Sequence, residues 1–184
     1  EAARTLKDLE LFLYASTDAA LNISLRKFDA PITEETELVP TPGRFYAIAK
    51  IVGETMCIHY GKAYGLPWSI IRINWALTAD ELLKIFEYEF WEDMLDPQDR
   101  ERLGPKLANG QGVFAPLFLN GDSAVDQLTD PDDTAQGFVL AIEHYEAARN
   151  NIFNIAGVAP FRYLDVIEQI ANGLGVTWDS ARVA

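Results

Sequence analysis

The sequence predicts an α/β protein with a parallel sheet, and three apolar segments carry that prediction. Residues 9–15, 68–74 and 152–157 are short, nearly continuous apolar runs, which are typical of strands buried in a parallel sheet. A long helical pattern lies between the first two runs, and a second one precedes the third. We therefore expect strands and helices to alternate along the chain.

The composition limits both the class of protein and its partners. The chain has 184 residues, of which 49% are apolar, which is ample for a hydrophobic core. Its net charge of −13 argues against nucleic acid or an anionic membrane as a partner, because both attract clustered cations. The sequence has a single cysteine, Cys57, and no apolar run reaches the roughly 18 residues of a membrane span. We expect a cytoplasmic protein without a metal centre, since His59 and His144 lie far apart in the sequence.

The helical pattern that follows residue 40 is the segment around which the other elements are organised. Thr41 is a suitable N-cap, and Pro42 suits the first helical position, where a missing N–H costs nothing. Apolar residues then recur at three- and four-residue steps, which predicts a buried stripe. This stripe consists of Phe45, Ile48, Ala49, Val52, Met56 and Ala63.

Tyr46 and Lys50 lie four residues apart on the neighbouring face of this helix, so the phenol and the ammonium are one turn apart. A free tyrosine has a pKa of about 10, and a cation about 4 Å away favours the phenolate by roughly 4 kcal/mol at an effective dielectric near 20. Tyr46 would then act as a general acid or base near neutral pH. The same spacing occurs by chance on many helices, so the pair alone leaves a structural role open.

Polar residues follow the first predicted strand directly. Ser16, Thr17 and Asp18 stand at its carboxyl end, which is where ligands bind in open α/β sheets. A Ser-Thr-Asp sequence after a strand is also typical of a turn or a helix cap. Asn22, a few residues on, is able to adopt a positive φ angle.

The residues around the Tyr–Lys pair form a longer motif. It comprises Tyr46-x-x-x-Lys50-x-x-x-Glu54, then Tyr60, Gly65-Leu66 and the strand that begins at Trp68. This motif resembles the extended short-chain dehydrogenase/reductase family, and within it the NAD-dependent epimerase/dehydratase branch. The resemblance covers residues 9 to 176. It implies the C-terminal part of a doubly wound, Rossmann-like parallel sheet in residues 1–75, and a small, mostly helical substrate-binding region with a returning strand in residues 76–184.

The resemblance also implies roles for individual residues. Tyr46 would exchange a proton with the substrate, Lys50 would lower the pKa of Tyr46 and hold the nicotinamide ribose, and Thr17 would hold the substrate oxygen. The cofactor would be NAD or NADP, contacted by Tyr46, Lys50 and Ile73. Further substrate contacts would come from Ser16, Asp18 and Asn74.

Three departures from the family's pattern narrow the expected reaction. Ala19 stands where the family's dehydratases carry a glutamate that removes a carbon-bound proton, so epimerisation or carbonyl reduction fits better than dehydration. Asp126 or Gln127 stands where an arginine often holds a nucleotide-sugar phosphate, and an aspartate would repel a phosphate. No glycine-rich phosphate-binding fingerprint follows a strand in this sequence, so we expect a fragment of a longer enzyme.

Two functions from different classes follow from these observations. The first is an NAD(P)-dependent epimerase or carbonyl reductase, an oxidoreductase or isomerase that acts on a sugar or sugar-nucleotide-like small molecule. The alternative is a non-catalytic relative that serves as a binding or assembly module. The missing fingerprint and the departures from the family's pattern at Leu21, Ile73 and Asp126 favour it. We also expect the chain to self-associate or to bind a missing N-terminal half, because its first strand would lie at an open sheet edge. Family members tend to dimerise through the tyrosine-bearing helix, whose outer face would include Ile51, Thr55 and Ile58.

A capping box opens the next predicted helix. Thr78 and Glu81 have the spacing of reciprocal caps, and the helix would run to about Met94. Its aromatic residues are expected in the core or in a subunit contact. They are Phe86, Phe90 and Trp91.

The rest of the chain is predicted to contain further helices, a strand and loops. Asp130 before Pro131 is a strong helix start, and this helix would run to about Arg149. Residues 23–43 are rich in acidic residues and proline and are expected to form a loop, which the family resemblance implies would cover the active site. The remaining expected elements are a loop at 96–112, an edge strand at 114–119 and a last helix at 161–172.

Overall fold

The computed structural model describes residues 2–22, 28 and 30–183, and the chain divides into two compact units. The first unit comprises the described residues of Glu1–Ile23, Phe28–Ala76 and Leu128–Gly157. The second comprises those of Leu77–Gln127 and Val158–Ala184. Residues 23–27 and 29, which belong to the loop expected over the active site, lie outside the described residues.

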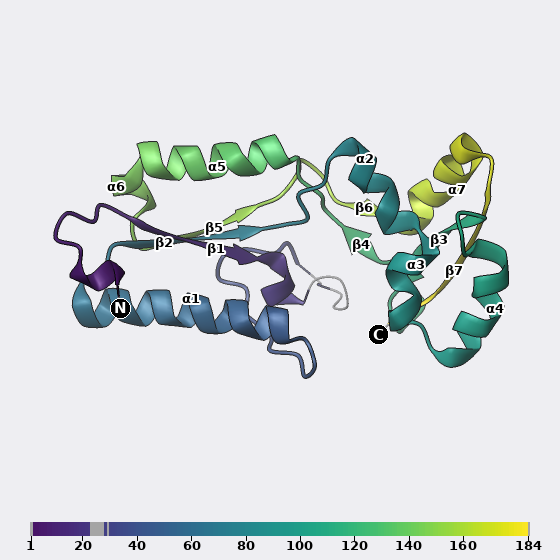
Figure 1. The fold of residues 1–184 in the computed structure, drawn as a ribbon, viewed down its shortest axis with the longest axis horizontal. Helices are drawn as coiled ribbons and strands as arrows, with labels where there is room; N and C mark the ends of the chain where they lie inside the picture. The colour runs from purple at the N-terminus through teal and green to yellow at the C-terminus, as the bar shows by residue number, and fades with distance from the viewer. Residues whose placement is uncertain (1, 23–27, 29, 184) are drawn as a thin grey trace. The chain divides into compact units, whose positions relative to one another are not determined.

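The first unit contains the predicted parallel sheet. Its strands are β1 (Phe12–Thr17), β2 (Trp68–Ile73) and β5 (Asn151–Ile155), all parallel, in the order β1-β2-β5 (Figure 1). The α/β prediction and its three strands are confirmed, although β1 begins and ends a few residues later than expected. Thr17 pairs with Ile73, and Ile73 pairs with Ile155, so the three carboxyl ends meet at one edge of the sheet.

Helices cover both faces of this sheet. Helix α1 (Phe45–Tyr64) lies on one face, and α5 (Pro131–Glu143) with α6 (Tyr145–Ala148) lies on the other (Figure 1). Alternate residues of β2 pack against the helices on opposite faces of the sheet, because successive side chains of a strand point to opposite faces. Ile70 packs with Cys57 of α1, whereas Ile71 packs with Ala141 and Ala148. The expected returning strand is β5, and it pairs with β2 within the first unit.

Helix α1 begins later than the capping signals predicted. Its first residue is Phe45 and its N-cap is Arg44, so the prediction that Thr41 caps the helix is wrong. Gly43 has a φ of +83°, which is a left-handed conformation that no right-handed helix continues through. The hydroxyl of Thr41 instead donates to the carbonyl of Val39.

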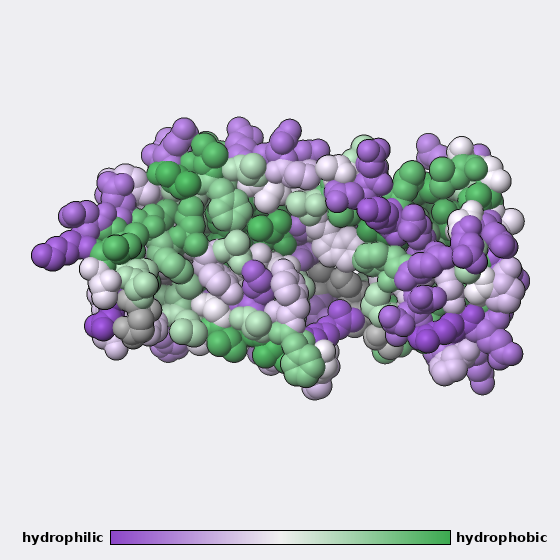
Figure 2. All heavy atoms as spheres, viewed as in Figure 1, coloured by the Kyte–Doolittle hydropathy of each residue, from purple (hydrophilic) through white to green (hydrophobic). Residues whose placement is uncertain are grey.

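The predicted buried stripe of α1 is also wrong, since most of it faces outward. The residues that α1 buries are Ala47, Glu54 and Cys57, whereas Phe45 is 78% exposed and Val52 and Met56 are also exposed. Figure 2 shows apolar side chains gathered along the outer side of α1. Ile58, expected on the outer face, packs instead into the cluster of Cys57, Trp68 and Ile70.

Close packing explains why small residues form the inner face of α1. A Cβ atom at Gly53 would overlap the phenol of Tyr14, and one at Gly61 would overlap the indole of Trp68. The aromatic rings of β1 and β2 therefore provide the apolar surface of this contact, and the glycines of α1 leave room for the rings. A search for large apolar residues at helical spacing misses such a face.

The second unit is a separate α/β assembly. Its helices are α2 (Ala79–Leu82), α3 (Tyr88–Trp91), α4 (Pro97–Leu107) and α7 (Tyr163–Leu174). Strands β3 (Gly112–Leu117) and β7 (Thr177–Arg182) pair in parallel, and β4 (Val125–Asp126) pairs antiparallel with β6 (Phe161–Arg162). The core is aromatic, with ring centroids of Trp91 and Tyr163 5.9 Å apart and those of Phe86 and Tyr163 5.3 Å apart.

Two predictions for this unit require correction. The helix expected to run from Thr78 to Met94 is broken at Glu87, which has an extended conformation, although its capping box is confirmed. Phe86 and Trp91 are buried as expected, whereas Phe90 is half exposed. The expected loop at 96–112 contains α4, because Asp96 accepts from the Asp99 N–H and Pro97 occupies the first turn.

Candidate active site

The carboxyl end of β1 is a short polar segment held by its own hydrogen bonds. The hydroxyl of Thr17 donates to the Asp18 carboxylate at 3.0 Å and accepts from the backbone N–H of Ala19 at 3.2 Å. Thr17 thereby caps the 3-10 helix η2 (Asp18–Leu21), which ends at Asn22 with a φ of 58°. The cap and the positive φ are both as the sequence indicated, and Thr17 and Asp18 are buried.

Lys50 connects the tyrosine-bearing helix to this strand. Its ammonium donates to the carbonyl oxygen of Ala15 at 2.7 Å. The same Nζ atom lies 5.6 Å from the ring centroid of Tyr46 and 5.6 Å from that of Tyr14. Tyr46 itself is 62% exposed. The structure thus brings the predicted pair together, with the cation between a tyrosine of α1 and one of β1.

A buried ion pair lies one helical turn beyond Lys50. The guanidinium of Arg72 donates from Nε to Glu54 Oε1 at 3.0 Å and from Nη2 to Glu54 Oε2 at 2.9 Å. The hydroxyl of Ser16 donates to Glu54 Oε1 at 2.5 Å. All three side chains are buried, so the Ser16 hydroxyl, which was predicted to contact substrate, is directed to a protein partner.

Arg72 also reaches the loop that precedes α1. Its Nη1 donates to the carbonyl oxygen of Glu34 at 3.0 Å, and the Glu34 carboxylate accepts from the backbone N–H of Asn154 at 2.9 Å. Sequence reasoning assigned no role to Arg72 or Glu34. An arginine inside an apolar strand was the available signal, because a buried charge requires a partner.

The end of β2 holds the other predicted contacts. Asn74 is buried; its N–H donates to the Ile155 carbonyl at 3.0 Å and its Oδ1 accepts from the Trp75 N–H at 2.7 Å. Ile73, predicted to contact the cofactor, is half-buried and packs on the α5 side of the sheet. Thr17 ends β1 and Asn74 follows β2, which is the neighbouring strand. Every predicted site residue lies in the first unit.

Asp126 belongs to the second unit and is only 4% exposed. Burial raises its pKa to about 6, opposed by the backbone N–H of Gln127, which donates at 2.8 Å, and by the neighbouring phenol of Tyr163. The same burial, together with the Asp126 charge, raises the pKa of Tyr163. Asp126 is therefore a core residue of the second unit.

The part of the chain that the structure describes contains neither a metal cluster nor a membrane-spanning helix. Within residues 2–22, 28 and 30–183, no group of three or more His, Cys, Asp or Glu side chains is arranged to hold a metal ion. None of the helices in that part of the chain is long and apolar enough to cross a membrane.

Two curated proteins resemble the chain along much of its length. A trifunctional UDP-glucose 4,6-dehydratase/UDP-4-keto-6-deoxy-D-glucose 3,5-epimerase/UDP-4-keto-L-rhamnose-reductase of Arabidopsis thaliana is 26% identical over 98% of the chain. An L-arabinose 1-dehydrogenase (NAD(P)(+)) of Haloferax volcanii is 29% identical over 65% of the chain. The chain spans 24% of the plant protein and 52% of the archaeal one.

A solved structure shares the fold. A short-chain dehydrogenase/reductase superfamily protein from Agrobacterium tumefaciens, crystallised with bound NAD, superposes with a TM-score of 0.76 at 21% identity. The match covers 94% of this chain and 55% of the other. The two proteins therefore share a fold over nearly all of this chain.

The sequence also matches a family model. The model is that of the NAD dependent epimerase/dehydratase family, and it matches residues 1–156. That range includes β1, β2, β5 and the Tyr46–Lys50 helix. The chain belongs to the NAD-dependent epimerase/dehydratase family.

Proposed function

We propose that this chain supplies the proton-transfer residues of an NAD(P)-dependent epimerase or carbonyl reductase, which acts on a sugar or sugar-nucleotide-like substrate. The observation that carries the proposal is the position of Lys50. Its ammonium donates at 2.7 Å to the carbonyl of Ala15, which stands two residues before Thr17 on β1. The same ammonium lies 5.6 Å from the centroid of the Tyr46 ring. A cation beside a phenol and a hydroxyl at a strand end is a suitable arrangement for moving a proton to or from a substrate oxygen.

The residues present fit the nicotinamide ribose of NAD or NADP. An ammonium has three N–H donors, so the bond to Ala15 orients Lys50 without exhausting it. Tyr46 is exposed beside Lys50. Ile73 is the last residue of β2, the strand that pairs with β1. The cofactor would supply or accept a hydride. Bound NAD in the Agrobacterium protein and NAD(P)(+) in the archaeal relative's name support this choice of cofactor.

The proton would move at the Tyr46 phenol. Tyr46 would take a proton from a substrate hydroxyl or give one to a carbonyl. Thr17 would hold the substrate oxygen by turning its hydroxyl away from Asp18. Ala19 has no titratable group, so this position removes no carbon-bound proton. Epimerisation or carbonyl reduction therefore fits better than dehydration.

The substrate class is inferred from the relatives. The plant protein's name specifies UDP-sugars, and the archaeal one's name specifies L-arabinose. The expected objection to a sugar nucleotide was a phosphate-repelling Asp126. Burial of Asp126 weakens that objection, because a side chain that is only 4% exposed is poorly placed to meet a phosphate.

A second copy of the chain is the proposed partner of α1. Its outward face presents Phe45, Val52 and Met56, and exposed apolar faces of this kind mark contact surfaces. Strand β1, at an edge of the described sheet, offers a second route to association. Light scattering at micromolar concentration should show a species larger than 20.5 kDa. A monodisperse monomer of that mass would contradict the proposal.

The test of the catalytic role is Tyr46→Phe in the complete natural protein, with NAD+ or NADP+ and with UDP-glucose or L-arabinose. NAD(P)H absorbance measures net oxidation, and chromatography of the sugar products measures epimerisation, which leaves no net NAD(P)H. Loss of the proton carrier should lower kcat by about a hundredfold or more, with cofactor affinity changed only a few fold. Lys50→Met should weaken cofactor binding, because it removes the ammonium proposed to hold the nicotinamide ribose. Tyr64→Phe, an exposed tyrosine on the same helix, is the matched control. Unchanged turnover in Tyr46→Phe would rule out the mechanism.

One observation favours the alternative of a non-catalytic module. The Thr17 hydroxyl already makes two bonds inside the protein, to Asp18 and to the Ala19 N–H. A hydroxyl that only caps η2 needs no substrate. The same assays separate the two functions, because a module would bind these probes without forming an oxidised or epimerised product.

A further inference from the structure

A single chain of hydrogen bonds runs from the end of β1 to β5. It passes from Ser16 to Glu54, then to Arg72, to Glu34 and to the backbone of Asn154. We propose that Glu54 and Arg72 are positioning residues, which fix the Thr17 strand end and the loop at 30–44 relative to Tyr46 and Lys50. The inference rests on the proposed function for its catalytic consequence, whereas the positioning itself is tested without turnover.

Helix α1 is attached to β1 by two side-chain contacts. Lys50 and Glu54 are four residues apart on α1, so their side chains share one side of the helix. Lys50 holds the carbonyl of Ala15, and Glu54 holds the hydroxyl of Ser16, which is the next residue. The helix is therefore attached at the two residues that immediately precede Thr17. Neither contact alone would fix both the distance and the rotation of the helix against the strand end.

The buried guanidinium of Arg72 connects β2 to α1 and to the loop before it. Arg72 lies opposite Ser16 in the register of β1 and β2. It donates to both carboxylate oxygens of Glu54 and to the Glu34 carbonyl. Arg72 and Glu54 are 3% and 1% exposed, so their charges are desolvated and only a specific geometry satisfies them. A buried pair of this kind contributes little net stability compared with apolar residues, and its value lies in the arrangement that it imposes.

The loop that leads into α1 is held by hydrogen bonds of Glu34 and Val39. Glu34 is held through its carbonyl by Arg72 and through its carboxylate by Asn154, and Asn154 is paired with Arg72 in register. Farther along, the N–H of Val39 donates to the carbonyl of Ala20 in η2 at 3.1 Å. The loop is thus fixed at two points before it enters α1 at Phe45, one residue before Tyr46.

The decisive experiment replaces the ion pair by apolar residues in Glu54→Met/Arg72→Met. Removing both charges leaves no buried unpaired ion, so the melting temperature should stay within a few degrees of the parent. The Asn154 amide should exchange with deuterium about tenfold faster or more, because the loop loses its anchor. In the complete protein, kcat should fall by about ten- to a hundredfold, with KM for UDP-glucose nearly unchanged. Glu146→Gln, an exposed carboxylate of the same unit paired with Arg149, is the control that should leave all three unchanged.

The outcomes separate this inference from the proposed function. Amide protection and kcat within about twofold of the parent in the folded double variant would overturn the positioning role. If the parent shows no hydride transfer, the proposed function fails, and faster exchange at Asn154 still supports the positioning role. If the double variant does not fold, the single variants Ser16→Ala and Glu34→Ala take its place, since each removes one side-chain contact. Faster exchange of the Ala19 amide in the first variant and of the Asn154 amide in the second supports the inference, and unchanged exchange in both overturns it.

Discussion

Arg72 in the first unit and Arg102 in the second each bind an acidic side chain through two nitrogens, in different surroundings. Arg72 is 3% exposed and meets Glu54, whereas Arg102 is 43% exposed and meets Asp99 on the same helix. Arg72 connects a strand, a helix and a loop. Arg102 connects α4 to β7.

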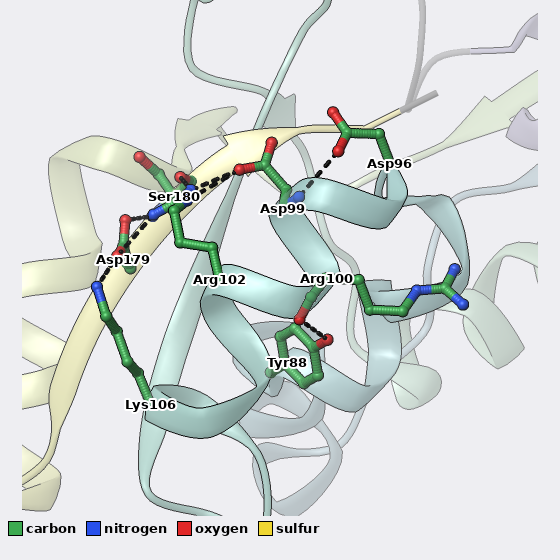
Figure 3. A network of polar contacts seen from close by, with 8 residues as sticks. All are labelled: Tyr88, Asp96, Asp99, Arg100, Arg102, Lys106, Asp179 and Ser180. Atoms are coloured by element: carbon green, nitrogen blue, oxygen red, sulfur yellow. Dashed lines mark hydrogen bonds and ion pairs between the residues drawn. The ribbon is translucent and has the colours of Figure 1, made fainter.

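Figure 3 shows the exposed network of the second unit. Arg102 donates to Asp99 at 2.7 Å and to Asp179 at 3.1 Å, and Lys106 lies 3.6 Å from Asp179. The bond to Asp99 is the largest cause that raises the pKa of Arg102. Partial burial would raise the pKa of Asp179, but the Ser180 N–H and the two cations outweigh it and lower the pKa.

The comparison shows that burial, rather than the identity of the residues, decides what an ion pair does. Water screens the exposed pairs of Arg102, so breaking one of them costs little. No water replaces a lost partner of Arg72, so breaking that pair leaves an uncompensated buried charge. Three variants test this contrast, and they follow from the largest expected effect to the smallest.

Glu54→Gln should be the most damaging change. It keeps the shape of the side chain but leaves the Arg72 guanidinium buried without a carboxylate, which should lower the free energy of unfolding by about 3–5 kcal/mol. Urea denaturation at pH 7 measures the loss. Glu146→Gln should change the free energy of unfolding by less than about 0.5 kcal/mol. Equal losses in the two variants would show that burial is not the deciding factor.

Asp126→Asn tests a buried carboxylate that has no cation beside it among the described contacts. Its pKa is raised from 3.8 to about 6, so the folded state binds the proton more tightly than the unfolded state does. The resulting stabilisation is fully present below about pH 3.8 and is lost as pH rises through about 6. Relative to Asp126→Asn, the parent should lose up to about 3 kcal/mol between pH 4 and pH 7.5. Parallel pH profiles of the unfolding free energy would contradict this assignment.

Asp179→Asn should have the smallest effect and the opposite sign. The pKa of Asp179 is lowered, so its charge stabilises the folded state above its ordinary pKa, and this contribution is lost as pH falls through the lowered value. Because Asp179 and both its cations are partly exposed, the loss at pH 7 should be about 1 kcal/mol or less and should shrink in 1 M salt. A larger, salt-independent loss would mean that the network of Figure 3 behaves like the buried pair.

Much of the first unit could be predicted from sequence because its signals are local. The apolar runs of β2 and β5 mark strands without reference to any other element. Asp130 accepts from the Asp132 N–H, as an aspartate before a proline indicates. The same pair, Asp96-Pro97, starts α4, and that helix was missed because its polar composition favours a loop.

The rest depends on contacts between distant segments. The inner face of α1 was misassigned because its contact is made by rings of β1 and β2 against Gly53 and Gly61. Ser16 and Arg72 share the partner Glu54, which lies 38 residues from Ser16 and 18 residues from Arg72 in the sequence. No spacing rule connects a serine at one strand end with a glutamate on the next helix, so the residues of the site were predictable and their bonding was not.

The discontinuity of the first unit has a consequence during protein synthesis. Residues 74–150 lie between β2 and β5 in the chain, and most of them belong to the second unit or to the covering helices. At 5–20 residues per second, a ribosome needs about 4–15 s to make them. Throughout that interval the edge of β2 has no β5 beside it, and Ile71 lacks Ala141 and Ala148. A nascent chain stalled before residue 150 therefore exposes an apolar strand, which makes it a substrate for chaperones and a source of aggregates.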